Sequence, residues 1–163
     1  MKLIKHGHCE DFLSHNEELL LKNESFHNLM LGLAYGIRDK KVDTNEPLFY
    51  SITDGQDVIA CALRSNKEKP LIITNMPVSA VDLLVQDLTS GGIELASIVG
   101  EEASATYFKD QWIKFKKLNF KINIHLGVYE CKKVIFPKEA LGELILATED
   151  HRETLRTYIR GFS

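Results

Sequence analysis

The spacing of apolar residues in the first part of the chain predicts one short strand followed by two helices. The strand is Lys2–His6, and the first helix covers Asp11–Leu21, where apolar residues return at helical spacing. The second helix starts near Ser25, whose hydroxyl can cap the first turn, and it ends near Gly36. Its apolar face consists of Phe26, Leu29, Met30, Leu33 and Ile37.

The middle of the chain changes from helical spacing to short extended runs, which predict three strands. They are Leu48–Thr53, Val58–Leu63 and Leu71–Asn75. Asp54-Gly55 is typical of a two-residue hairpin turn, because both central positions of that turn need a positive φ. Asn66–Lys69 supplies a second polar turn, so we expect the three strands to form an antiparallel meander.

A helix and a strand follow the meander. Met76-Pro77 opens the helix, since proline fits in a first helical turn, and Gly91-Gly92 ends it. Its apolar stripe consists of Val78, Val81, Leu84, Val85 and Leu88. A helical crossover joins strands that run in the same direction, so we expect Leu95–Val99 to lie parallel to Leu71–Asn75.

A long helix and a long strand come next. Glu101–Lys117 begins with glutamates and ends with lysines, which suits the helix dipole. We expect its buried stripe to contain Ala105, Phe108, Trp112 and Phe115. Phe120–Val128 alternates between apolar and polar residues, which predicts a half-buried strand.

The order of these elements predicts an α/β (α+β) fold with a mixed central sheet and helices on both faces. We assign residues 1–137 to this domain and residues 138–142 to a linker, because proline and glycine punctuate the chain there. Residues 143–163 contain a predicted strand, Glu143–Ala147, and a predicted helix, Glu149–Ile159. These two elements either begin a second domain or supply the closing strand and last helix of the first.

Composition and charge narrow the class of protein. The 163 residues are 44% hydrophobic and 26% charged, which is typical of a globular domain. The net charge is −3 and the few clustered lysines are flanked by aromatic and acidic residues, so we expect no nucleic-acid binding. The N-terminus lacks an apolar signal region, and no apolar run reaches the roughly 20 residues of a membrane span. The three widely spaced cysteines, Cys9, Cys61 and Cys131, favour reduced and buried thiols. We therefore expect a cytoplasmic protein that spans no membrane.

Several reactive side chains have simple structural interpretations. His6, His8 and Cys9 lie close together, but no second cluster with zinc-ligand spacing accompanies them, so we predict no metal site. Cys61 lies inside an apolar strand and is expected in the core rather than as a nucleophile. Trp112 falls on a helical apolar stripe, which indicates a core residue rather than a surface for stacking bases.

Three fragments of the sequence resemble parts of the GNAT (acetyl-CoA-dependent N-acetyltransferase) superfamily. Ser25–Leu33 is similar to its second helix, Asp57–Arg64 to its third strand, and Val128–Val134 to a strand that leads into a linker. The subgroup concerned has two tandem GNAT domains, and the chain resembles the N-terminal half of such a protein. The predicted order of helices and strands resembles the GNAT order over nearly the whole chain.

The resemblance implies an acetyl-CoA site between the last strand of the meander and the parallel strand. In the family, the pantetheine arm lies between these strands and the pyrophosphate binds at the amino end of the helix that follows. The matching residues here are Ile73, Thr74, Asn75, Met76, Val78, Ser79 and Ala80. The acceptor would be an amine, on a small molecule or a peptide.

The resemblance also implies a pair of proton-transfer groups. Tyr107, four residues after Ala103, matches the tyrosine that protonates the departing thiolate, although a packing role at a helix edge is the alternative. Glu94 and Glu101 flank the parallel strand near the expected entry of the amine. Either could act as the general base, and a solvated surface role is the alternative for both.

The loop at the implied pyrophosphate site departs from the family's pattern. The family has an arginine or glutamine followed by glycines, whereas Asn75–Ala80 has neither a glycine nor a basic residue. Pro77 lacks a backbone donor, and Val78 places a side chain where glycine would leave room. We therefore expect weak or absent acetyl-CoA binding by this chain alone.

Two functions remain open from the sequence. The first is a GNAT-type N-acetyltransferase domain, active or the degenerate half of a tandem enzyme. The second is a non-catalytic binding or scaffold module that has kept the fold and lost the cofactor. The expected macromolecular partner is a second GNAT domain or a second copy of the chain.

Overall fold

The structure is a computed structural model, and it describes residues 1–116, 118–136 and 142–162. By its internal contacts the chain divides into two units, Met1–Glu130 and Cys131–Ser163. We describe each unit by itself.

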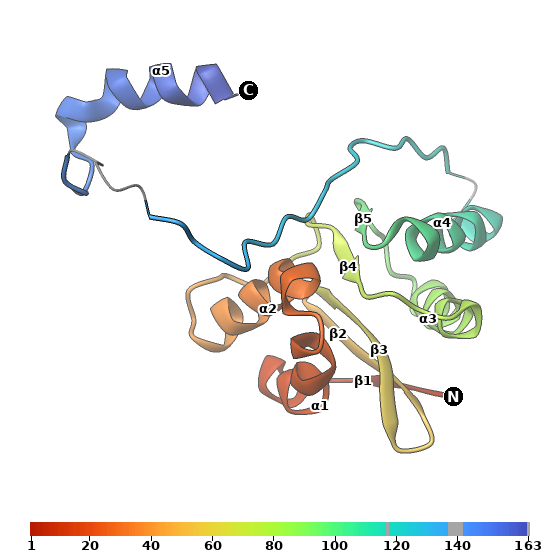
Figure 1. The fold of residues 1–163 in the computed structure, drawn as a ribbon. Coiled ribbons are helices and arrows are strands. Elements are labelled where there is room, and N and C mark those ends of the chain that lie inside the picture. The colour runs from red at the N-terminus through yellow and green to blue at the C-terminus, as the bar shows by residue number, and fades with distance from the viewer. Residues whose placement is uncertain (117, 137–141, 163) are drawn as a thin grey trace. The chain divides into compact units, whose positions relative to one another are not determined.

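The first unit is built on a five-stranded sheet in the order β1-β2-β3-β4-β5 (Figure 1). The strands are β1 (Lys2–Lys5), β2 (Leu48–Asp54), β3 (Asp57–Arg64), β4 (Leu71–Ile73) and β5 (Ile98–Val99). Neighbours from β1 to β4 pair antiparallel, and β4 pairs parallel with β5. The predicted meander and the predicted parallel pair are both confirmed.

Two pairs of helices accompany this sheet, and each pair contributes to a separate apolar core. The helices are α1 (Cys9–Leu21), α2 (Glu24–Arg38), α3 (Val78–Ser90) and α4 (Glu102–Lys116). Side chains of α1 and α2 pack with Phe49, Cys61 and Leu63 of the sheet. Side chains of α3 and α4 pack with Tyr50 and Ala62, which alternate with the first set along the strands. The sheet is therefore covered on both faces, as predicted.

The ends of several elements differ from the predictions by a few residues. Helix α1 begins at Cys9 rather than Asp11, and Asn23 rather than Ser25 occupies the N-cap position of α2. Pro77 is the N-cap residue of α3, so it lies just outside the first turn. Strand β4 ends at Ile73, and β5 begins only at Ile98. These differences arise because apolar spacing defines the middle of an element better than its ends.

The hairpin between β2 and β3 has a different central pair from the one predicted. Asp54 pairs with Asp57 in the ladder, so the turn consists of Gly55 and Gln56. Gly55 has a φ of 62°. Glycine at the first central position is the signature of a type II′ turn, in which the second position has a negative φ. A hairpin at this place was predicted correctly, but its register was one residue off.

Arg64, at the end of β3, is a buried cation that joins two loops. Its side chain is only 2% exposed. One guanidinium nitrogen donates to the Glu94 carbonyl at 2.8 Å and the other to the Glu46 carbonyl at 3.0 Å. Burial lowers the pKa of this guanidinium from its ordinary value, and the charges of Glu46 and Tyr50 oppose that shift. The bonds to neutral carbonyls position the loop before β5 and the loop before β2.

The chain after the middle of α4 is more exposed than predicted. Phe108 and Trp112 are buried and stack at a centroid distance of 5.6 Å, but Phe115 is 62% exposed and Ala105 is only half-buried. Ser104 takes the remaining buried place on the helix. Within the described residues 118–136 there is neither helix nor strand, so the prediction of a strand at Phe120–Val128 is wrong for this structure. All five apolar residues of that segment are exposed.

The second unit contains a 3-10 helix, η1 (Glu149–His151), that continues into α5 (Arg152–Phe162). The predicted helix at Glu149–Ile159 is thus present, but Glu143–Ala147 is not a strand. Residues 137–141, which include most of the predicted linker, lie outside the described residues. Among the described helices of the whole chain, none has the length and apolar character that crossing a membrane requires.

Candidate functional site

The segment implied to bind acetyl-CoA runs from the end of β4 into the first turn of α3. Four of its seven implied residues are buried, namely Ile73, Thr74, Met76 and Ala80. The other three, Asn75, Val78 and Ser79, are exposed. A cofactor arm that binds to backbone groups needs those groups accessible, so the burial already restricts where such an arm could lie.

Ser104 on α4 accepts a hydrogen bond from the backbone N–H at the centre of this loop. The Met76 N–H donates to the Ser104 Oγ at 3.0 Å. The same hydroxyl donates to the Asn75 Oδ1 at 3.2 Å. Ser104 is 3% exposed, so water and ligands have little access to these bonds. The loop between β4 and α3 is therefore held by α4, and the Met76 amide is not available to a phosphate.

The two parallel strands also remain close together where a pantetheine arm would need space between them. Gly100, directly after β5, lies so near β4 that an added Cβ would be 2.5 Å from the Ile73 Cγ1 and 3.0 Å from the Ile73 carbonyl oxygen. Glycine is required there because any larger residue would collide with β4. This close approach leaves no room beside Ile73 for an extended ligand.

Thr74 forms its hydrogen bonds toward β3 rather than toward β5. Its N–H donates to the Cys61 carbonyl at 3.1 Å, and its hydroxyl accepts from the Cys61 N–H at 3.0 Å. The first bond continues the backbone ladder toward β3, and the second joins the Thr74 side chain to β3. Thr74 thus stabilises the sheet, and none of these groups is directed toward β5.

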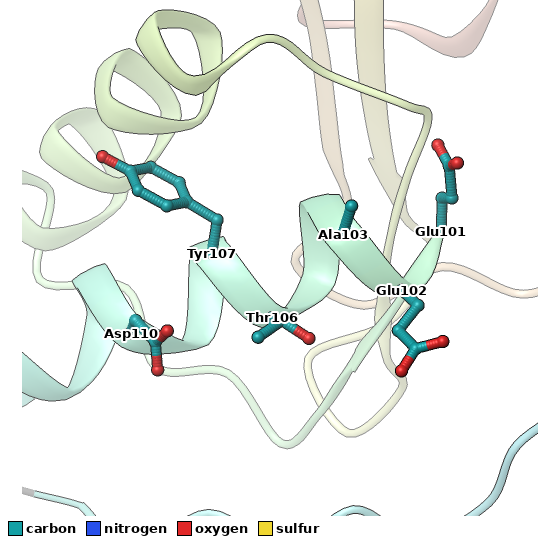
Figure 2. A pocket seen from close by; sticks show the side chains of 6 residues that line it. All are labelled: Glu101, Glu102, Ala103, Thr106, Tyr107 and Asp110. Atoms are coloured by element: carbon teal, nitrogen blue, oxygen red, sulfur yellow. The ribbon is translucent and has the colours of Figure 1, made fainter.

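Tyr107, the implied acid, projects from the middle of α4 toward α3 (Figure 2). Its hydroxyl donates to the Asp82 Oδ1 at 3.1 Å. Partial desolvation and this hydrogen bond raise the pKa of the phenol above its ordinary value. Asp82 had no signal in the sequence, because a lone aspartate on the polar side of a helix is usually solvated.

Tyr107 lines two open pockets beside α4. The first, with a volume of about 520 Å³, is lined by Glu101, Glu102, Ala103, Thr106, Tyr107 and Asp110. The second, of about 730 Å³, lies between α3 and α4 and is lined by nine residues that include Asp82, Lys114 and Phe115. The carboxylates of the first pocket favour a cationic amine and disfavour the phosphates of a nucleotide.

The two glutamates considered as bases differ in position. Glu101 lines the first pocket together with Tyr107 (Figure 2). Glu94 lies in the loop before β5, where its carbonyl accepts from Arg64. Of the two, Glu101 therefore has the better geometry for contact with an amine in that pocket.

Cys61 lies in the core as predicted and Cys9 is also buried, but Cys131 is exposed, contrary to the expectation of three buried thiols. Burial raises the pKa of the Cys9 thiol to about 11, and burial also raises the pKa of Cys61. Both thiols are therefore protonated near neutral pH and poor nucleophiles. Within the described residues, no group of three or more His, Cys, Asp or Glu side chains is arranged to hold a metal ion.

A buried series of hydrogen-bonded side chains on the α1 side of the sheet was not anticipated from the sequence. The His6 Nε2 lies 2.7 Å from the Ser51 Oγ, which accepts from the Asn16 Nδ2 at 2.7 Å. Burial lowers the pKa of His6, the neighbouring His15 lowers it further, and Asp11 opposes the shift. Ser51 is fully buried, so these hydrogen-bonded side chains have a structural role and do not form a site for a substrate.

Comparison of the chain with models of known protein families, with curated proteins and with solved structures finds no match.

Proposed function

We propose that this chain is a GNAT-type N-acetyltransferase domain, in an enzyme that transfers an acetyl group from acetyl-CoA to an amine, and that it is the degenerate half of that enzyme. The proposal rests on the resemblance of the sequence fragments. The order β1 to β5, with α3 crossing between two parallel strands after an antiparallel meander, is compatible with it.

The observation that supports degeneracy is the hydrogen bond from the Met76 N–H to the Ser104 Oγ. It removes the central donor of the implied pyrophosphate loop, and Pro77 removes the next one because proline has no N–H. Gly100 against Ile73 leaves no gap for the pantetheine arm. In this proposal acetyl-CoA is bound by a second GNAT domain, and this domain contributes to the amine side of the reaction.

The acidic pocket beside Tyr107 supports the proposal that this domain binds the amine acceptor. Glu101, Glu102 and Asp110 place three carboxylates around it. Such a lining attracts a protonated amine and repels a nucleotide. The second candidate function, a non-catalytic scaffold module, is favoured by the same Met76–Ser104 bond, because a pure scaffold also needs no cofactor site.

Calorimetric titration of acetyl-CoA and of CoA into the chain tests degeneracy. We expect no saturable heat with either ligand up to about 1 mM, which corresponds to less than about 4 kcal/mol of binding free energy. A micromolar dissociation constant would overturn degeneracy and would assign Met76, Val78, Ser79 and Ala80 as backbone ligands.

A pair of variants makes the same titration sharper. Ser104→Ala frees the Met76 amide, whereas Thr106→Ala alters an exposed hydroxyl on the same helix. If the buried bond is what excludes the cofactor, only Ser104→Ala should gain measurable acetyl-CoA binding. Transfer of acetyl groups to an amine by the chain together with a second GNAT domain would favour the enzyme over the scaffold.

A further inference from the structure

The segment Phe120–Val128 has the pattern of a strand but no strand partner among the described residues. Its apolar positions are Phe120, Ile122, Ile124, Leu126 and Val128, and each is between 39% and 74% exposed. An exposed apolar face of this size marks an interaction surface in a folded protein. Alternation with a period of two further indicates that the interaction is that of an edge strand.

The same unit has an open sheet edge at β5. In the described chain β5 is the last strand of the sheet on that side, and it pairs only through Ile98 and Val99 with β4. The Ser97 carbonyl accepts from the Leu71 N–H at 3.0 Å, so Ser97 faces β4. Because successive residues direct their backbone groups to opposite edges, Ile98 directs its N–H and C=O outward. Unpaired groups of this kind are a template for another strand.

The charges at the two surfaces are complementary. The polar positions of the segment include Lys121 and His125 and no acidic residue. Strand β5 is flanked by Glu94 and Glu101. A strand placed beside β5 would therefore bring Lys121 toward an acidic border, which favours the encounter and discourages like-charged competitors.

We propose that Phe120–Val128 of one molecule adds as an edge strand to β5 of a second copy of this chain, and that the second copy makes the same contact in return. Each molecule has both a donor segment and an acceptor edge, so the pair is self-complementary, as two-fold dimers require. Helix α4, of 15 residues and about 22 Å long, lies between the two in the sequence.

The area that this exchange covers is sufficient for a specific dimer. Ten apolar side chains, five from each copy, would leave water together with the surfaces they contact. Their area amounts to roughly 1,000 Å² or more, which approaches the size of a standard specific interface. The inference does not depend on the proposed enzymatic role, because its test, the oligomeric state of the chain alone, involves no cofactor.

Sedimentation velocity of the full chain, without ligand, tests the proposal. We expect a dimer at concentrations of tens of micromolar, and protection of the amides of residues 120–128 from hydrogen exchange. Ile124→Lys places a charge on the apolar face and should weaken dimerisation at least about tenfold. Asn123→Lys adds the same charge on the opposite face, so it should leave the dimer intact.

Several results would overturn the proposal. A monomeric wild-type chain would overturn it. This holds whether the amides of residues 120–128 undergo rapid hydrogen exchange or are protected by pairing within their own chain. A dimer that survives Ile124→Lys uses a different surface. Loss of the dimer in both Ile124→Lys and Asn123→Lys would mean that the contact does not depend on which face of the segment is apolar. Fluorescence of Trp112, the single tryptophan, verifies that each variant is folded. If Ile124→Lys fails that check, Ile122→Lys takes its place.

Discussion

Residues 1–116 and residues 118–136 both contain apolar segments with the pattern of a strand, but only the first region buries them. In β2, Phe49, Tyr50 and Ile52 are at most 3% exposed, because neighbouring strands and two layers of helices cover both faces. In Phe120–Val128 five alternating apolar side chains are exposed to solvent. The difference shows that a strand pattern reports the need for a partner strand, while the partner itself depends on contacts far away in the sequence.

The largest effect on the free energy of unfolding is expected when two phenylalanines on α4 are compared. Phe108 lies in the buried part of the helix and Phe115 in its exposed part. Phe108→Ala removes a fully buried ring that stacks on Trp112 and should lower the free energy of unfolding by about 3–5 kcal/mol. Phe115→Ala should cost less than about 1 kcal/mol, because its ring is mostly exposed. Urea unfolding followed by Trp112 fluorescence measures both. Equal costs would show that the end of α4 is covered in solution.

The next effect concerns the contact between the two parallel strands. Gly100→Ala would place a Cβ at 2.5 Å from the Ile73 side chain and 3.0 Å from its carbonyl, so β5 must shift. We expect a loss of about 1–3 kcal/mol in unfolding free energy. Gly7→Ala is the matched control, since nothing lies within 4 Å of its Cβ position. A Gly100→Ala variant as stable as this control would mean that β4 and β5 can separate, which reopens the case for a cofactor between them.

A smaller effect is expected from pH, through His6 in the first region. The groups that face it are His15 and Asp11 from α1 and Ser51 from β2. Because its pKa is lower in the folded than in the unfolded chain, folding favours the neutral ring. Its stabilising contribution is complete above a pH of about 6.5 and is lost as the pH falls through the lower folded-state pKa. Unfolding curves across this pH range should show the decline, and His6→Gln should make it shallower. An unchanged slope would exclude His6 as the cause.

The smallest effect on stability is expected at Tyr107. Tyr107→Phe removes the partly exposed hydrogen bond to Asp82 and should cost less than about 1 kcal/mol. In any preparation that transfers acetyl groups, the same change should lower turnover by about a hundredfold or more if the phenol is the acid. Unchanged turnover would remove Tyr107 from the mechanism, and a large loss of stability would instead assign it a packing role.

Much of the fold could be predicted because its signals are local. The Gly91-Gly92 pair ends α3 as expected, with Gly92 at a φ of 67°, and the crossover through α3 predicted the parallel pair. The positions and the accessibility of the side chains in the candidate site could not be predicted. Ser104 looked like an ordinary helical serine, although it lies four and eight residues before Phe108 and Trp112 and so shares their buried face. Its bond to Met76 depends on how α4 crosses the end of β4, which no local pattern contains.

The buried guanidinium of Arg64 has a consequence for the rates of folding and unfolding. Its two hydrogen bonds reach carbonyls 30 and 18 residues away, so both loops must close before the charge is satisfied. We expect these two contacts to form after the main barrier to folding, so that their free energy acts on the unfolding rate. Arg64→Met should then speed unfolding and leave the folding rate nearly unchanged, which stopped-flow folding and unfolding kinetics would measure.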